Sequence, residues 1–193
     1  MEPEDEEILK IGQPDFIAFN YYNTLTCEYD DGTQTLSQAT DQQTARGEKG
    51  MFRGCKNPNL KVSPFGWEMD SVGLRVTLRE IYSRYELPMI ITENGIGGED
   101  ILTKDYKVHD SYRIDFLREH IEQMRLAIKD GCEIFGFCPW SAIDLISTHQ
   151  GFKKRYGFIY VNRDEFDLKD LKRYKKDSFY WYKDVIKTNG DKL

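Results

Sequence analysis

Three consecutive units, each an apolar segment followed by an amphipathic helix pattern, constrain the fold of this chain more than any other feature. The apolar segments cover residues 15–22, 89–92 and 133–140, and each is short and rich in aliphatic and aromatic side chains. Such runs are typical of strands buried on both faces of a parallel sheet. Repeated strand–helix units predict parallel strands with right-handed crossovers, so we expect an α/β protein.

Apolar residues at helical spacing mark the three helices. The first pattern covers residues 74–85, and the second covers residues 114–128 with Asp110 as its predicted N-cap. The last helix is expected to end near Gly190, with the basic stretch 169–176 as its solvated face.

The connections between these elements differ greatly in length. The helix-to-strand joints are minimal, at Leu87-Pro88 and Asp130-Gly131, whereas each strand is followed by a long loop. In parallel α/β folds the chemistry lies on loops at the C-terminal ends of the strands. Three strands do not close a barrel, since a (β/α)8 barrel needs eight strands and about 250 residues. The chain is therefore predicted to be either a small open sheet or part of a larger barrel.

The charge balance excludes several classes of partner. Lys and Arg number 27 against 33 Asp and Glu, a net charge of −6, and we expect no nucleic-acid partner because phosphate-backbone binding needs a basic face.

No apolar run reaches the roughly 20 residues that span a bilayer, so no membrane partner is expected. The acidic start, residues 1–7, does not resemble a signal peptide, and the four cysteines form no CxxC pair. These features favour a cytoplasmic protein with reduced thiols.

Glu93 is the first candidate for chemistry. It ends the second strand and precedes Asn94-Gly95, a pair that permits a sharp turn, so its carboxylate would lie where a rigid element holds a nucleophile or base well. The alternative is a helix-capping or solvated loop glutamate. Trp140, at the end of the third strand, could stack on the C–H face of a sugar or fill the core. Asn20 and Tyr22 end the first strand, and either could reach Glu93 or only pack.

A loop with hydroxyls and cations is the second candidate. Ser147, Lys154 and Tyr156 could wrap a phosphate, with the lysine acting as a point charge. The alternative is that residues 153–155 are a solvated basic run. Asp144 is a possible second carboxylate, although a hydrogen-bonding role that stabilises its loop is favoured. The three histidines do not cluster as metal ligands.

Several segments, taken together and in order, resemble the family 1 retaining β-glycosidases. The segment Ile-Thr-Glu-Asn-Gly is similar to that family's nucleophile motif, and three others match its neighbouring motifs. These segments are residues 19–22, 65–70, 91–95 and 139–144. The spacing of Ser147, Lys154 and Tyr156 is similar to the phosphate-binding signature of the 6-phospho-β-glycosidase branch. The Glu-Trp pair by which plain β-glucosidases bind free sugar hydroxyls is absent.

The resemblance implies a role for each matching residue. Glu93 would be the nucleophile that forms a covalent glycosyl-enzyme, and Tyr22 would hydrogen-bond it and help to set its protonation. Asn20 would lie near the same carboxylate, and Trp140 would form the platform under the cleaved sugar. The three loop residues would hold the sugar 6-phosphate. Thr148 stands where the 6-phospho-β-galactosidases place a Trp, which implies a gluco preference. No metal or organic cofactor is implied.

One departure from the family pattern limits what this chain is expected to do alone. The general acid/base motif, Thr-x-Asn-Glu-Pro, is absent, as are the early Gln and His that bind sugar hydroxyls. Residues 1–193 are therefore expected to be the C-terminal part of a single TIM-barrel glycosidase domain. They would form its last three βα units, an incomplete barrel.

The resemblance thus implies a 6-phospho-β-glucosidase that hydrolyses phosphorylated β-glucosides or disaccharides by a retaining double displacement. This chain would supply the nucleophile and the phosphate-binding loop. The isolated chain is expected to be inactive because the acid/base half is missing, and it would pair with that N-terminal half or self-associate. The alternative is a non-catalytic or degenerate fragment that binds phosphosugars without turnover.

Overall fold

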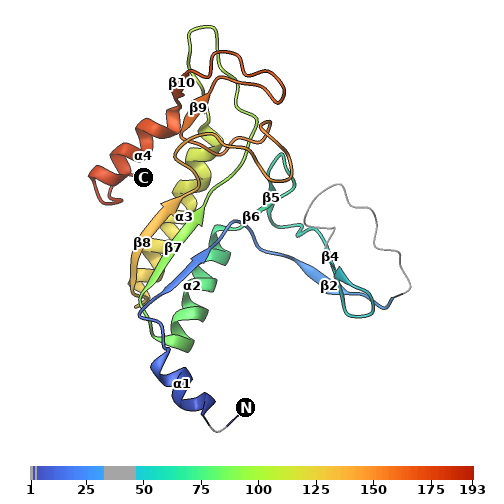
Figure 1. The fold of residues 1–193 in the computed structure, drawn as a ribbon, viewed down its shortest axis with the longest axis vertical. Helices are drawn as coiled ribbons and strands as arrows, with labels where there is room; N and C mark the ends of the chain where they lie inside the picture. Colours follow the sequence, from blue (N-terminus) through green and yellow to red (C-terminus); the bar gives the residue numbers. More distant parts are fainter. Residues whose placement is uncertain (1, 3, 33–46) are drawn as a thin grey trace.

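The computed structural model describes residues 2, 4–32 and 47–193. Its centre is a parallel three-stranded sheet in the order β1-β7-β8 (Figure 1). The strands are β1 (Ile17–Asn20), β7 (Met89–Asn94) and β8 (Ile134–Pro139). This arrangement confirms the predicted α/β architecture with parallel strands.

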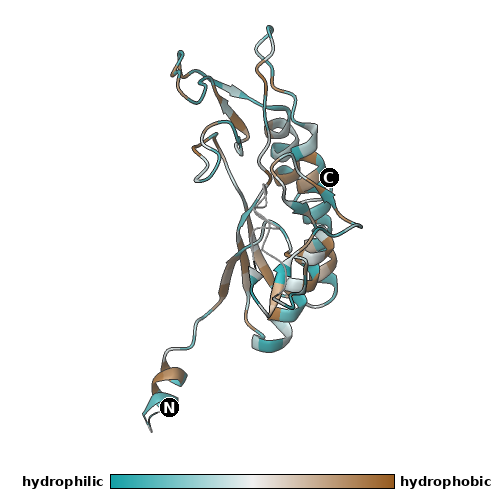
Figure 2. Cartoon of the chain, turned by 90° about the vertical axis from the view of Figure 1, so that its right-hand side faces the viewer, coloured by the Kyte–Doolittle hydropathy of each residue, from teal (hydrophilic) through white to brown (hydrophobic). Residues whose placement is uncertain are grey.

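Helices connect and follow the three strands. Helix α2 (Ser71–Tyr85) lies between β1 and β7, α3 (Ser111–Lys129) lies between β7 and β8, and α4 (Asp177–Lys187) follows β8. Helices α2 and α3 lie along one face of the sheet (Figure 2). A short helix, α1 (Asp5–Ile11), precedes β1 and has no buried residue. None of the helices in the described ranges is long and apolar enough to cross a membrane.

Short antiparallel strands fill the long loops. The loop after β1 contains β2 (Cys27–Tyr29), β3 (Gly47–Glu48), β4 (Phe52–Gly54), β5 (Lys61–Val62) and β6 (Glu68–Met69). The loop after β8 contains β9 (Ile159–Val161) and β10 (Arg173–Lys175). The sequence predicted only a loop between β1 and α2, and part of that loop, residues 33–46, lies outside the described residues.

The core lies between the sheet and its helices. Met89 and Ile91 of β7 are fully buried against Leu74 and Leu78 of α2 and Ala127 of α3. Their spacing follows from the geometry of each element, since alternate strand residues and every third or fourth helix residue face the same side. A second cluster joins α3 and α4 to the loop after β8.

The face of β1 that turns away from the helices differs from the prediction. Both faces of the strand were expected to be buried, but Ala18 is exposed and Phe16, just before the strand, is 49% exposed. The Phe16 ring meets Phe135 of β8 edge-on, with ring centroids 5.4 Å apart. The prediction is wrong for this face because no other element in the described part of the chain packs against it. Strand β7 also runs two residues further than predicted, through Glu93 and Asn94.

The basic stretch 169–176 is not the solvated face of the last helix, so that prediction is wrong. Helix α4 begins only at Asp177, and residues 173–175 form β10, which pairs with β9. Lys176 is fully buried. Its ammonium group lies between the carboxylates of Asp100 and Asp144, and these two ion pairs offset the cost of burying its charge.

Asp110 occupies the N-cap position of α3 as predicted, but its side chain makes no capping hydrogen bond to that helix. Its carboxylate instead accepts hydrogen bonds from the backbone N–H and the hydroxyl of Ser178, at the start of α4. It also forms an ion pair with Arg113. The residue therefore joins the first turns of α3 and α4 rather than capping one of them.

Candidate active site

The carboxylate of Glu93 lies at the C-terminal end of β7, beside a tyrosine from the end of β1. The hydroxyl of Tyr22 donates a hydrogen bond to Glu93 Oε2 at 2.6 Å. The backbone N–H of Tyr21 donates to the Glu93 carbonyl at 2.9 Å, which holds the chain after β1 against β7. Burial, and then the hydrogen bond to Glu93, raise the pKa of Tyr22 far above its usual range. The phenol therefore stays a neutral donor to the carboxylate, and the predicted contact between Tyr22 and Glu93 is present.

The two residues after Glu93 join all three strand ends. The side-chain amide of Asn94, which is fully buried, donates to the Tyr21 carbonyl at 2.8 Å, and the Trp140 N–H donates to the Asn94 carbonyl at 2.8 Å. At Gly95 an added Cβ would lie 2.1 Å from the Trp140 carbonyl oxygen, so only glycine permits this approach. The Glu-Asn-Gly sequence thus fixes the direction of Glu93 through its neighbours.

Asn20 and Trp140 flank Glu93 on the two adjacent strands. Asn20 is the register partner of Glu93 in the sheet, and its side-chain oxygen accepts a hydrogen bond from the Thr92 hydroxyl at 2.7 Å. The structure therefore places Asn20 next to Glu93 but gives its oxygen a different partner. Trp140, half-buried, directly follows β8. Its platform role stays a prediction.

Lys154 is a buried cation without a hydrogen-bond partner among the described residues. Its side chain is 1% exposed, and its ammonium nitrogen lies 3.6 Å from the ring centroid of Trp67. The rings of Phe65 and Tyr156 lie within 5.1 Å and 5.3 Å of the same nitrogen. Burial lowers the pKa of Lys154 to about 8. Aromatic faces attract a cation but provide no acceptor for its N–H groups, so this cluster holds an ammonium group that can still donate hydrogen bonds.

The two predicted hydroxyl residues lie together in the same loop. Ser147 and Tyr156 are both buried, and the Ser147 hydroxyl donates a hydrogen bond to the side-chain oxygen of Gln150 at 3.4 Å. Burial raises the pKa of Tyr156, an effect that the nearby Ser147 hydroxyl partly opposes. Two backbone hydrogen bonds between Ser147 and Gly151 close the turn that carries the serine. The tyrosine ring lies beside Lys154, so the structure brings the predicted phosphate loop into one cluster.

Trp67 connects this cluster to the carboxylate. Its ring lies edge-on to Tyr22 with centroids 5.3 Å apart, and the Lys154 ammonium lies over the same indole ring. The hydroxyl of Tyr22 in turn contacts Glu93. A continuous set of side chains therefore joins the candidate nucleophile to the buried cation.

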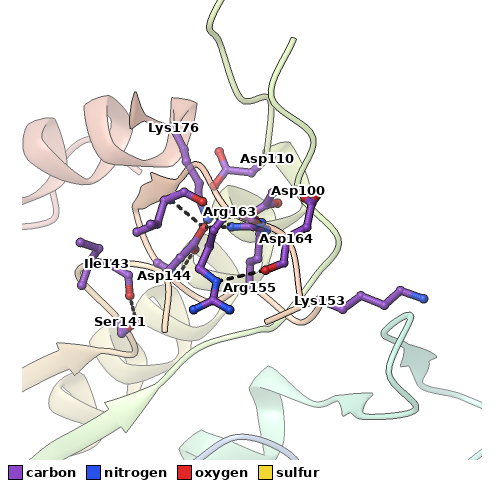
Figure 3. Close-up of polar contacts among 12 residues, drawn as sticks. Asp100, Asp110, Ser141, Ile143, Asp144, Lys153, Arg155, Arg163, Asp164 and Lys176 are labelled. Atoms are coloured by element: carbon purple, nitrogen blue, oxygen red, sulfur yellow. Dashed lines mark hydrogen bonds and ion pairs between the residues drawn. The ribbon is translucent and has the colours of Figure 1, made fainter. Parts of the chain in front are cut away.

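Asp144 does not belong to this set of side chains. One of its oxygens accepts from Lys176 at 2.6 Å and from the Gly157 N–H at 3.0 Å, and the other accepts from Arg155 at 3.0 Å. Figure 3 shows Asp144 beside Arg155 and Lys176. The favoured interpretation, a carboxylate that stabilises its own loop, is confirmed.

Sequence reasoning did not assign a function to Phe65 and Trp67, although both lie in a segment that carried the family resemblance. Their contacts with Lys154 depend on the β5–β6 loop folding over the C-terminal end of the sheet, which no local pattern indicates. Gly97 was also missed: an added Cβ there would lie 2.5 Å from the Lys154 side chain. Its lack of a side chain makes room for the lysine stem.

A carboxylate at a strand end, hydrogen-bonded by a tyrosine and joined through one indole ring to a buried cation, is the candidate active site. The model of glycosyl hydrolase family 1 matches residues 1–191. The chain belongs to that family.

Curated relatives and solved structures give the same result. An aryl-phospho-β-D-glucosidase, BglC of Bacillus subtilis (strain 168), is 51% identical, and the alignment covers 100% of this chain and 42% of the relative. The 6-phospho-β-glucosidase AscB of Escherichia coli (strain K12) is 40% identical over 99% of this chain and 38% of its own length. A family 1 β-glucosidase from Thermotoga maritima superimposes with a TM-score of 0.78 at 31% identity, covering 97% of this chain and 38% of that one. The chain thus spans about two fifths of the length of these proteins.

Proposed function

We propose that this chain supplies the nucleophile and the phosphate-binding loop of a 6-phospho-β-glucosidase, which hydrolyses 6-phospho-β-glucosides with retention of configuration. The observation that carries the proposal is the buried ammonium group of Lys154, which lacks a hydrogen-bond partner among the described residues and lies one ring away from the Glu93–Tyr22 pair. A buried charge is costly unless it is paired. A site that keeps such a cation unpaired is suited to an anionic group on the substrate.

In the first chemical step, a carboxylate oxygen of Glu93 attacks the anomeric carbon of the sugar while the bond to the leaving oxygen breaks. Tyr22 donates to Oε2, which orients the carboxylate. Trp140 lies under the sugar, and Asn20 lies near the same carboxylate. In the second step, water attacks the anomeric carbon, displaces Glu93 and releases the sugar.

The 6-phosphate is held by the cluster around Lys154. Its dianion takes charge-assisted hydrogen bonds from the ammonium group and hydrogen bonds from the Ser147 and Tyr156 hydroxyls. The cation–π contact with Trp67 then gives way to a contact with a full negative charge, which also favours the protonated form of the lysine.

The chain forms the last three βα units of a TIM barrel. A partner for the open sheet, either the N-terminal half or a second copy, covers the exposed apolar residues Phe16 and Phe135. The general acid/base that protonates the leaving oxygen comes from that N-terminal half. Retaining glycosidases place their two carboxyl groups about 5–5.5 Å apart. The cytoplasmic location stays a prediction.

One observation favours a second candidate function, phosphosugar binding without turnover. Both oxygens of Asp144 are occupied by buried cations, so this carboxylate is not available as the second catalytic group. The chain alone therefore supplies a nucleophile and an anion-binding site, but Asp144 does not serve as its general acid.

Calorimetric titration with glucose 6-phosphate and with glucose tests the proposal. We expect the chain to bind the phosphorylated sugar at least about tenfold more tightly, and Lys154→Met to remove that difference, because each charge-assisted hydrogen bond contributes about 1.5–3 kcal/mol. The exposed neighbour Lys153, 66% exposed in its side chain, provides the matched control, since Lys153→Met leaves the buried cluster intact. Equal affinities for the two sugars, or an unchanged ratio in Lys154→Met, would show that this lysine has a structural role.

A further inference from the structure

Six buried charged side chains form a network next to the phosphate loop, and all of them except Arg113 are labelled in Figure 3. Three carboxylates face three cations, and the side chains of all six are at most 6% exposed. They are Asp100, Asp110, Asp144, Arg113, Arg155 and Lys176. The charges balance within the network. The Lys154 ammonium, by contrast, contacts rings rather than a carboxylate.

Arg155 connects this network to the site, because it stands in the chain between Lys154 and Tyr156. Its guanidinium group donates to Asp144 at 3.0 Å and to the backbone carbonyls of Val161, at 2.9 Å, and Arg163. The side chain of Lys154, the residue before Arg155, points away from the network, and its ammonium group lies over the ring of Trp67. One short segment therefore presents a cation to the network and a second cation to the site.

The backbone of Arg155 is held as firmly as its side chain. Its N–H donates to the Gly98 carbonyl at 2.9 Å, and its carbonyl accepts from the Gly98 N–H at 3.0 Å. Arg113, from α3, donates to the same carbonyl at 2.9 Å. The segment is therefore tied to the loop after β7, to α3 and, through Asp144, to the loop after β8.

We propose that Arg155 is a positioning residue for phosphate recognition: its guanidinium group, seated on Asp144, fixes the backbone from which Lys154 and Tyr156 reach the phosphate. The proposal rests on the proposed function. A lysine has four flexible side-chain bonds, so the position of its ammonium group depends on a fixed Cα and on a packed stem. Binding groups held by rigid surroundings lose less freedom when the ligand arrives.

A planar guanidinium group suits this position better than an ammonium group would. Arg155 reaches three acceptors at once, whereas a lysine is a compact point charge on a flexible stem. Asp144 keeps Lys176 as a second cation when the Arg155 side chain is removed, but the network then holds three carboxylates and only two cations. We therefore expect Arg155→Ala to be less stable than wild type and its segment to be looser, whereas Arg155→Lys keeps the charge balance.

The test measures the affinity for inorganic phosphate in Arg155→Ala and Arg155→Lys, together with circular dichroism and thermal unfolding of each. We expect Arg155→Ala to bind phosphate at least about tenfold more weakly, and Arg155→Lys to bind it severalfold more weakly. Guanidinium ion, at a concentration well below denaturing, should restore part of the phosphate affinity of Arg155→Ala, because it can bind Asp144 in place of the missing side chain. It should restore nothing in Lys154→Met.

A core variant separates positioning from a general loss of stability. Leu78 is fully buried in α2 and belongs to the cluster beneath the sheet, so Leu78→Ala lowers stability without touching the loop. We expect it to keep wild-type phosphate affinity. Should Arg155→Ala not fold, Arg155→Lys, which keeps the charge, decides the question.

The outcomes distinguish the two proposals. If Lys154→Met leaves phosphate binding unchanged, or if the wild-type chain does not bind phosphate, the proposed function fails and the positioning role fails with it. If Lys154→Met abolishes binding while the folded Arg155 variants bind like wild type, only the positioning role is overturned. A loss in Leu78→Ala equal to that in Arg155→Ala would likewise assign the effect to stability.

Discussion

Replacing Lys154 with methionine should make the protein more stable while removing its preference for phosphorylated ligands. The side chain is 1% exposed, and burial lowers the pKa of its ammonium group from the ordinary value of 10.5 to about 8. At 1.36 kcal/mol per pKa unit, that difference corresponds to about 3 kcal/mol of destabilisation at pH 7, where the lysine is charged in both the folded and the unfolded chain. The attraction between the ammonium group and the Trp67 ring, which methionine does not provide, offsets part of this gain, so we expect Lys154→Met to raise the free energy of unfolding by about 1–3 kcal/mol.

The sign of the pH dependence distinguishes this explanation from a simple gain in packing. Because the folded chain binds this proton more weakly than the unfolded chain, the stability of the wild-type protein rises as the pH increases from about 8 to 10.5. The advantage of Lys154→Met should therefore shrink over that range. Urea unfolding at pH 7 and at pH 9.5 measures it, with Lys153→Met as the control that changes stability by no more than about 0.5 kcal/mol at either pH. A destabilised Lys154→Met, or an advantage that does not depend on pH, would refute the reasoning.

Three further predictions concern the same site. Tyr22→Phe removes the 2.6 Å hydrogen bond to Glu93 and should slow formation of the glycosyl-enzyme about 10–100-fold, measured as the rate of covalent labelling by a fluorosugar; an unchanged rate would mean that the hydroxyl does not act on the nucleophile. The affinity for glucose 6-phosphate should fall as the pH rises above about 8, because Lys154 loses its proton in the empty site; calorimetry at pH 7 and pH 9.5 checks this, and a constant affinity contradicts it. Thr148, which is exposed and small, should leave the complete enzyme with a higher kcat/KM for aryl 6-phospho-β-glucosides than for the galacto epimers, and the reverse order would overturn this assignment.

The periodicity of the sequence was sufficient to predict the parallel sheet. Apolar runs and helical spacing indicated the order of β1, β7 and β8, and parallel strands bring their C-terminal ends together. That geometry left open whether Asn20 or Tyr22 reaches Glu93 or only packs, and the specific hydrogen bond from Tyr22 was implied by the family resemblance. The prediction of the sheet succeeded because both signals, periodicity and strand direction, are local or follow from a general rule of handedness.

The contacts that the sequence did not predict are those between loops. Lys176 lies in a basic run that is typical of a solvated helix face, and only the folded chain shows two carboxylates from distant loops enclosing its ammonium group. The packing of Trp67 against Lys154 likewise depends on the β5–β6 loop, whose path has no periodic signal. Buried ion pairs and cation–π contacts between loops depend on tertiary structure, which composition and spacing do not encode.

Covalent trapping tests most directly the claim that Glu93 is the nucleophile of a phosphosugar hydrolase. The reagent is a 2-deoxy-2-fluoro-6-phospho-β-glucosyl fluoride, whose fluoride leaves without protonation, so the reaction does not need the missing general acid. We predict that mass spectrometry finds the sugar on the peptide that contains Glu93, and that neither Glu93→Gln nor Lys154→Met is labelled at a comparable rate. A label on Asp144, or equal labelling of Glu93→Gln, would contradict the account.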